Sequence, residues 1–221
     1  QDVRPDMVQK QIDAVFEDIE VDAVKIGMLS GSEIMYAVAE KLRQYNPGNV
    51  VVDPVMYAKN GCPLMDPNAI GTLIEAVVPL AGVLTPNIPE AEKIAGTEIR
   101  DIDDMEKAAE RIFAMGCRNV LVKGGHAEGD AVDVLYEGNR FRRFSTPRIH
   151  TKNTHGTGCT YSSAIASNLA LGLTVEEAVE RAKRYVTTAI MHSLDIGKGN
   201  GPVHHFYDLY RCGLGKAKRR E

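Results

Sequence analysis

The sequence predicts an α/β fold with a mostly parallel central sheet that helices cover on both faces. Short runs rich in β-branched residues alternate with helical runs along the first half of the chain. Strands joined by helices of this length form βαβ units, whose strands are parallel and buried on both sides. Two later β-rich runs, 132–136 and 140–145, are separated only by Glu137-Gly138-Asn139, which predicts an antiparallel hairpin at the sheet edge.

The composition fits one globular domain covering residues 1–221. Of the 221 residues, 44% are hydrophobic and 25% charged, and the formal net charge is −4. The mild acidity argues against nucleic acid as a partner, and no apolar run has the length that a bilayer span needs, so we expect no membrane partner either. Four scattered cysteines without a Cys-x-x-Cys pair indicate a reduced, cytoplasmic protein.

The first elements are justified by periodicity. Apolar residues at helical spacing predict a helix around residues 12–19. Residues 23–29 are expected to form a strand that ends in a glycine turn, and residues 34–44 a helix. Ser30 or Ser32 is the expected cap of that helix, because a serine oxygen can accept a hydrogen bond from a free amide of the first turn.

The middle of the chain continues the alternation. Residues 50–53 read as a short buried strand, and Asp66-Pro67 as a helix start, since aspartate can cap and proline fits the first turn. Residues 83–85 are expected to form a third strand and residues 120–122 a fourth. Between them, apolar residues from 105 to 113 recur with helical spacing and predict a further helix.

The segment 151–160, with the sequence Thr-Lys-Asn-Thr-His-Gly-Thr-Gly-Cys-Thr, is the most informative stretch of the chain. It leads into an alanine-rich helical run, 162–171, with a helix start near Cys159. A glycine-rich turn at a helix start gathers free amides at the positive end of the helix dipole, which binds anions. The same field favours the thiolate of Cys159. The alternative is a plain tight turn with a buried, inert cysteine.

The C-terminal part carries a strong helix signal at 175–192, with Thr174 as cap and Glu177 at the capping-box position. The following loop, Gly197-Lys198-Gly199-Asn200-Gly201, is either a linker or a segment that closes over a nucleotide. It is not a phosphate-binding P-loop, and no GxxxxGK[ST] motif occurs elsewhere in the chain.

Polar residues follow the carboxyl ends of the expected parallel strands. Asp53 follows the second strand, Asn87 and Glu90 the third, and Lys123 the fourth. Ligands of open parallel sheets bind beyond these ends, so we expect the four side chains at one rim. Two carboxylates can hold Mg²⁺, directly or through its waters, and a lysine can neutralise phosphate charge. The combination predicts phosphoryl transfer.

Each of these residues also has a purely structural interpretation. Asp53 could cap the next turn, and Glu90 could simply favour a helix N-terminus. Lys123, which precedes two glycines, could be a solvated turn residue. All of these residues follow strand ends. A purely structural explanation for the whole set is therefore much weaker than one for any single residue.

Several segments resemble the hydroxymethylpyrimidine/phosphomethylpyrimidine kinases of thiamine biosynthesis, which belong to the ribokinase-like superfamily. The segments are 51–56, 84–91, 122–126, 153–160 and 197–206. The resemblance covers essentially the whole chain. It implies a three-layer αβα fold and two successive ATP-dependent phosphorylations, first of the pyrimidine's hydroxymethyl group and then of the resulting monophosphate. It also implies Mg²⁺ as cofactor and a homodimer.

The resemblance assigns catalytic roles to the glycine turn. Gly156, Thr157 and Gly158 match the family's anion-hole loop. Cys159 stands where most ribokinase-like sugar kinases have an aspartate base, and it would take the proton of the substrate hydroxyl or lie beside it. Lys123 matches a phosphate-contacting lysine.

Further roles follow from the same resemblance. Asn87 and Glu90 match an Asn-x-x-Glu element that organises Mg²⁺ and phosphates, and Asp53 matches an acidic residue near the phosphates and the metal. Lys198 is expected at the nucleotide. The remaining substrate contacts expected from the family are those of Met28 and Val55 with the pyrimidine ring and of Lys59 in a flap over it.

One departure concerns the start of the chain. Family members begin with a strand carrying a glycine-rich Gly-Ser-Asp segment, followed by a Thr-Ala-Gln element, and both help to bind the pyrimidine. The sequence begins after them, so we expect a domain without the family's N-terminal strand and substrate-binding segment. Three alternatives stay open: a pyridoxal or pyridoxine kinase, a non-catalytic pyrimidine- or nucleotide-binding module, and a thiol enzyme that uses Cys159 as a covalent nucleophile.

Overall fold

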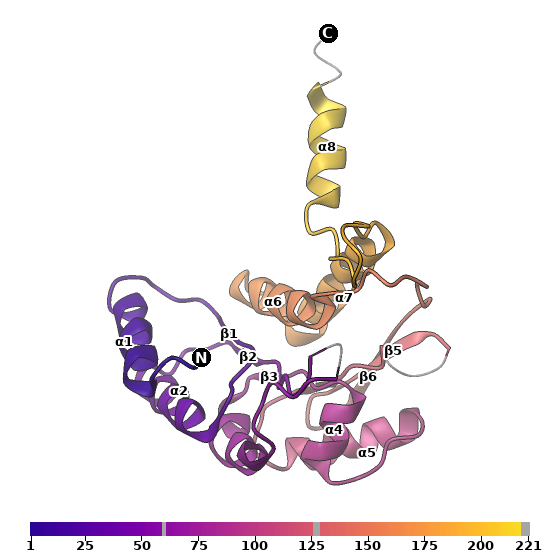
Figure 1. Cartoon of the computed structure of the whole chain (residues 1–221). Helices are drawn as coiled ribbons and strands as arrows, with labels where there is room; N and C mark the ends of the chain where they lie inside the picture. The colour runs from indigo at the N-terminus through magenta and orange to yellow at the C-terminus, as the bar shows by residue number, and fades with distance from the viewer. Residues whose placement is uncertain (59–60, 126–128, 218–221) are drawn as a thin grey trace.

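The computed structural model describes residues 1–58, 61–125 and 129–217 and shows three layers (Figure 1). A six-stranded sheet, in the order β1-β2-β3-β4-β5-β6, lies between helices on both faces. The strands are β1 (Val24–Ile26), β2 (Val50–Val52), β3 (Val83–Leu84), β4 (Val120–Val122), β5 (Ala131–Tyr136) and β6 (Phe141–Thr146). The helices are α1 (Pro5–Phe16), α2 (Ser32–Tyr45), η1 (Pro67–Ala69), α3 (Ile70–Thr72), η2 (Leu73–Val77), η3 (Val78–Leu80), α4 (Ile88–Ala95), α5 (Ile102–Phe113), α6 (Thr157–Ala170), α7 (Val175–Met191) and α8 (Tyr207–Ala217).

The pairing of the strands confirms the predicted α/β fold. β1 to β4 are parallel, with Val24 opposite Val50 and Val51 opposite Val83. β5 pairs antiparallel with β4, and β6 pairs antiparallel with β5 at the edge of the sheet. The four parallel strands therefore direct their carboxyl ends to one rim, and the hairpin closes one side of the sheet.

The two faces of the sheet bury separate cores, and β2 shows why. Successive side chains of a strand point to opposite faces. Val50 and Val52 enter the core beneath α2, α4 and α5, whereas Val51 enters the core beneath α6 and α7. Figure 1 shows α6 and α7 on one face and α1, α2, α4 and α5 on the other, with α8 projecting away from the body of the molecule.

Local sequence signals specified some helix ends and missed others. The Thr174–Glu177 capping box of α7 is present, and Asp66 caps η1 by accepting from the amide of Asn68. The expectation of a serine cap for α2 is wrong, because Gly31 occupies the cap position in extended backbone and no side chain caps the helix. The expected first strand is also too long, since only Val24–Ile26 pairs with β2.

Among the described residues, none of the helices combines the length and apolar character that crossing a bilayer requires.

Candidate active site

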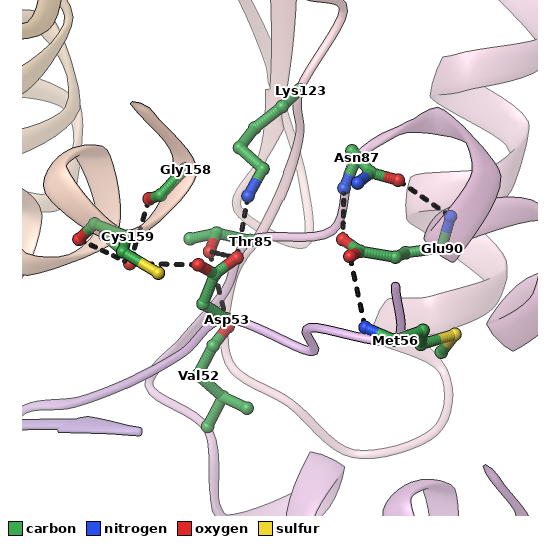
Figure 2. Close-up of polar contacts among 10 residues, drawn as sticks. Val52, Asp53, Met56, Thr85, Asn87, Glu90, Lys123, Gly158 and Cys159 are labelled. Carbon is green, nitrogen blue, oxygen red and sulfur yellow. Dashed lines mark hydrogen bonds and ion pairs between the residues drawn. The ribbon is translucent and has the colours of Figure 1, made fainter. Parts of the chain in front are cut away.

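An ion pair lies at the centre of the rim. Asp53 directly follows β2, Lys123 directly follows β4, and the Nζ atom of Lys123 is 2.7 Å from Oδ1 of Asp53. Asp53 is only 2% exposed, and two hydroxyl groups also reach its carboxylate, Thr85 at 3.4 Å and Ser162 at 3.2 Å. Figure 2 shows this cluster of contacts around Asp53. Asp53 therefore fixes the lysine ammonium at the point where three strands and α6 converge.

The charges at the rim are strongly coupled. Burial opposes the charged form of Lys123, but the carboxylates of Asp53 and Glu90 outweigh it and raise the pKa of Lys123 above its ordinary value. Burial raises the pKa of Glu90 as well, against the opposing effect of Lys123. The site thus holds a permanent cation beside a carboxyl group whose ionisation the surroundings disfavour.

Asn87 and Glu90 form a capping box at the start of α4. The side chain of Asn87 accepts from the Glu90 amide at 2.9 Å, and Oε2 of Glu90 accepts from the Asn87 amide at 2.8 Å. The other Glu90 oxygen is 3.5 Å from the amide nitrogen of Met56, which follows β2 (Figure 2). Glu90 therefore does stabilise a helix N-terminus, as its structural interpretation predicts. The same capping box places the Glu90 carboxylate at the rim. Helix α4 as a whole was not expected from the sequence, although the Asn-x-x-Glu spacing is a capping-box signal.

The glycine turn forms the start of α6. Gly156 has φ +82°, a left-handed conformation that glycine adopts without strain, and no described side chain caps the helix. The helix begins at Thr157, two residues before the expected start at Cys159. The amide of Thr157 donates to the carbonyl of Thr154 at 3.4 Å, so the amides of Gly158 and Cys159 are available to an anion, at the positive end of the helix dipole.

A short C-terminal segment secures this turn. The amide of His155 donates to the carbonyl of Gly201 at 3.1 Å, and the amide of Gly201 donates to Oδ1 of Asn153 at 3.0 Å. A Cβ atom at Gly201 would lie 2.3 Å from the carbonyl oxygen of Leu194, so only glycine fits there. One turn further, the side chains of Thr160 and His205 are 3.0 Å apart.

Gly158 brings the helix start to the ion pair. A Cβ atom built on Gly158 would lie 3.6 Å from Nζ of Lys123 and 3.8 Å from Oδ2 of Asp53. In Figure 2, Gly158 and Cys159 lie on one side of Asp53 and Lys123, and Asn87 and Glu90 lie on the other. The amides of α6 and the lysine ammonium can therefore act on the same anionic group.

Cys159 occupies the first turn of α6 and is exposed. The alternative of a buried, inert cysteine is therefore wrong. The residue borders a groove of about 560 Å³ between α6 and α7. A thiol at this position is accessible to a substrate and lies in the field of the helix start.

Other residues expected at the site are less closely associated with it. Met28, 52% exposed, lies beyond the end of β1, and the half-buried Val55 lies beyond the end of β2. Lys198 is exposed in the loop after α7, and it makes no hydrogen bond or ion pair within the part of the chain that the structure describes. Lys59, expected in a flap, lies outside the described residues.

Thr85 and Ser162 were not expected from the sequence as partners of Asp53. Thr85 was seen only as the end of a strand and Ser162 only as part of a helical run. The signal for Ser162 was its position one turn after Gly158, since residues four apart lie on the same helix face.

The donors at the rim fit Mg²⁺ held with a nucleotide. Within the described residues, no group of three or more acidic, histidine or cysteine side chains forms a closed metal site. The rim offers the carboxylates of Asp53 and Glu90, and both already have hydrogen-bond or ion-pair partners. Mg²⁺ is commonly held by one or two carboxylates together with waters and substrate phosphates, which matches this donor set.

Comparison with solved structures places the fold. The structure is similar to the Bacillus subtilis pyridoxal kinase solved with ADP, with a TM-score of 0.86 and 37% identity over 93% of this chain and 78% of that one. It is also similar to the Clostridium difficile phosphomethylpyrimidine kinase, with a TM-score of 0.76 and 47% identity over 86% of this chain and 78% of that one. The fold and the site together define a kinase of the ribokinase-like class.

Comparison with sequences places the chain within that class. The family model for phosphomethylpyrimidine kinase matches residues 1–204, and the chain belongs to this family. It is 53% identical to the thiamine biosynthesis bifunctional protein ThiED of Geobacter sulfurreducens, over 92% of this chain and 42% of that protein. It is 43% identical to the hydroxymethylpyrimidine/phosphomethylpyrimidine kinase of Bacillus subtilis, over 90% of this chain and 74% of that protein. The chain thus spans less than half of the bifunctional relative and about three quarters of the other.

Proposed function

We propose that the protein transfers the γ-phosphoryl group of ATP to the hydroxymethyl group of 4-amino-5-hydroxymethyl-2-methylpyrimidine, and then a second phosphoryl group to the monophosphate. The observation that carries this proposal is the meeting of Gly158, Lys123 and Asp53, which joins a helix start to a fixed cation. The names of the relatives supply the substrate.

The chemistry assigns a part to each group. In the first transfer, the sulfur of Cys159 takes the proton of the substrate hydroxyl, whose oxygen forms the new bond to the γ-phosphorus. The bond from that phosphorus to the bridging oxygen breaks, and ADP leaves. The amides at Gly158 and Cys159, together with the ammonium of Lys123, stabilise the charge on the transferring phosphoryl oxygens. In the second transfer the acceptor is a phosphate oxygen, which is already ionised and needs no base of comparable strength.

Asp53 and Glu90 would hold Mg²⁺ through its waters, with Asn87 orienting Glu90 through the capping box. When bound, the ion neutralises phosphate charge. Asp53 is also proposed to position the lysine ammonium against the phosphates, and its ion pair with Lys123 supports this role. Lys198 and Lys59 are proposed to contact nucleotide and substrate from their loops, and Met28 and Val55 to contact the pyrimidine ring.

We also propose that residues 1–221 act as one kinase domain in a cytoplasmic homodimer. The family membership supports this proposal. Light scattering coupled to size-exclusion chromatography measures the molar mass in solution and tests the dimer directly, since a mass of one chain across the micromolar range contradicts it.

A pyridoxal kinase is the second candidate, because the chain is 37% identical to a pyridoxal kinase over 93% of its length. The deciding assay supplies Mg-ATP with equimolar hydroxymethylpyrimidine and pyridoxal, and follows the products by mass spectrometry. Pyrimidine mono- and diphosphate support the proposal, whereas pyridoxal phosphate alone favours the second candidate. Absence of any phosphorylated product favours a binding module. A product that forms without ATP favours a thiol enzyme.

A further inference from the structure

A second buried ion pair lies behind the site. The Nζ atom of Lys183, on α7, is 2.7 Å from Oδ2 of Asp133, on β5, and both side chains are buried. A pair of charges this deep costs desolvation energy and is weak grounds for stability alone. Neither residue belongs to the rim, and neither was singled out by the sequence analysis. The contacts of the pair with neighbouring groups show what it holds in place.

The carboxylate of Asp133 reaches the backbone next to Lys123. Its Oδ1 atom accepts a hydrogen bond of 2.9 Å from the amide of Gly124. Gly124 has no room for a side chain, because a Cβ atom would lie 1.8 Å from the carbonyl oxygen of Val132. On its other side, the amide of Lys123 donates to the carbonyl of Pro86 at 2.8 Å. The backbone that carries the lysine is thus held from both sides, and on one side the holding group is Asp133.

Lys183 secures Asp133 in turn. Besides the carboxylate, its ammonium donates to the carbonyl of Ala131 at 2.7 Å, which fixes the beginning of β5. The buried hydroxyl of Tyr161, on α6, lies in the same region, where burial and the charge of Asp133 raise its pKa well above the ordinary value. Asp133 is also one of the carboxylates that favour the charged form of Lys123, after Asp53 and Glu90. The ion pair and its hydrogen bonds connect α7 and β5 with the end of β4.

We propose that Asp133, held in place by Lys183, is a positioning residue for Lys123: it fixes the backbone at Gly124, so that the lysine ammonium stays at Asp53 and the start of α6. This inference rests on the proposed phosphoryl transfer, because it assigns Asp133 and Lys183 a part in that reaction. Both side chains are buried, and the proposal assigns them an effect that is transmitted through Lys123.

The first test is a set of variants with a matched control. Asp133→Asn keeps an oxygen for the Gly124 amide but removes the charge that pairs with Lys183. Lys183→Met removes the other charge, and Lys183→Arg restores it. Val179→Ala, one turn from Lys183 and fully buried, creates a small cavity in the same core and serves as control for a general loss of stability. All assays are run at a temperature where circular dichroism shows each variant to be folded.

We expect Asp133→Asn and Lys183→Met to lower kcat by at least about tenfold with little change in the KM for the pyrimidine, because small misplacements of a group that acts in the transition state are costly. Lys183→Arg should recover part of the loss, and Val179→Ala should leave kcat within about twofold of the parent, since Val179 contributes only apolar packing and none of the polar contacts that lead to Lys123. In the Lys123→Ala background, Asp133→Asn should cost nothing further. An equal loss of kcat with and without Lys123 overturns the proposal, as does an unchanged kcat in folded Asp133→Asn.

A readout that needs no catalysis separates this inference from the proposed function. Limited acetylation with acetic anhydride, followed by mass spectrometry of the peptide that contains Lys123, reports how accessible and how well held the ammonium is. We expect faster acetylation of Lys123 in Asp133→Asn or Lys183→Met than in the parent or in Val179→Ala. Equal rates in all four overturn the inference, even if the parent is an active kinase. A parent without kinase activity sinks the proposed function, whatever the acetylation shows.

Discussion

The ammonium of Lys123 and the carboxylate of Asp53, 70 positions apart in the sequence, lie 2.7 Å from each other behind the start of α6. The Lys123 side chain is 12% exposed and that of Asp53 3%, so little water screens the pair. Asp53 is held by Thr85 and Ser162 as well. The protein alone therefore orients the lysine ammonium, and a charge that is fixed in advance stabilises a transition state best.

Replacement of this lysine should separate catalysis from stability. Lys123→Ala is expected to lose transition-state stabilisation on the order of 3 kcal/mol. It should also destabilise the fold by roughly 3 kcal/mol, because Asp53 is left buried without its partner. Steady-state kinetics and urea unfolding measure the two effects. The double variant with Asp53→Asn should recover much of the stability but none of the activity, and a variant with parental kcat contradicts the assigned role.

Replacement of the exposed thiol should affect turnover and spare nucleotide binding. Cys159→Ala is expected to lower kcat by roughly 10²–10⁴-fold, the usual contribution of a positioned base. The affinity for ADP, measured by calorimetry, should change little. Cys159→Asp supplies another base and should restore part of the rate. An unchanged rate in Cys159→Ala would falsify the base assignment.

Gly158 should be dispensable for folding and required for phosphate binding. Its backbone is compatible with alanine, and the added methyl group would meet Lys123 and Asp53 only at ordinary contact distances. Gly158→Ala is therefore expected to unfold at the same temperature as the parent or slightly above it, because alanine favours helix. The methyl group occupies the space in front of the ammonium, so we expect the KM for ATP to rise at least about tenfold, or about 1.4 kcal/mol. Full activity would show that phosphate does not approach through this space.

Glu90 should make stability fall as the pH rises. Burial is the main cause of its raised pKa, so the folded protein binds this proton more tightly than the unfolded chain. Its contribution is present below the ordinary glutamate pKa and is lost as the pH rises from there through the raised pKa in the folded state. Glu90→Gln can still accept a hydrogen bond from the Asn87 amide. We expect its stability relative to the parent to increase as the pH rises from 4 to 8.

Thermal unfolding across this pH range measures the effect of Glu90→Gln. Glu90→Ala is the control, because it lacks both the titrating group and the capping oxygen, and it should be about 1 kcal/mol less stable than Glu90→Gln at every pH. If the stability of Glu90→Gln relative to the parent falls as the pH rises, the raised pKa of Glu90 is contradicted.

The cysteines should differ sharply in their reactions with alkylating reagents. Burial raises the pKa of the Cys117 thiol to about 12, and its side chain is inaccessible. Iodoacetamide at pH 8 should therefore modify Cys159 in the native protein and spare Cys117, with peptide mass spectrometry as the readout. Mg-ATP with hydroxymethylpyrimidine should slow the modification of Cys159. Equal modification of Cys117 before unfolding would contradict its burial.

Some features followed from the sequence because they depend on neighbours along the chain. The Thr174–Glu177 capping box, the cap at Asp66 and the hairpin around Glu137-Gly138-Asn139 were all predicted correctly. So was the parallel sheet, since strands alternating with helices allow few other arrangements. The prediction of a serine cap for α2 was wrong. Gly31 is the cap residue and has no side chain that could accept a hydrogen bond, so the backbone geometry alone sets where the helix begins.

The sequence by itself determined which chemistry the chain carries: a glycine turn before Cys159, and acidic, amide and lysine side chains after buried strands. It determined the fold class for the same reason, because periodicity and turn residues are local properties. Only the tertiary structure decided that Asp53 pairs with Lys123, that Ser162 completes its partners and that Asp133 holds Gly124. These contacts join residues from different elements, and their distances depend on how sheet and helices pack.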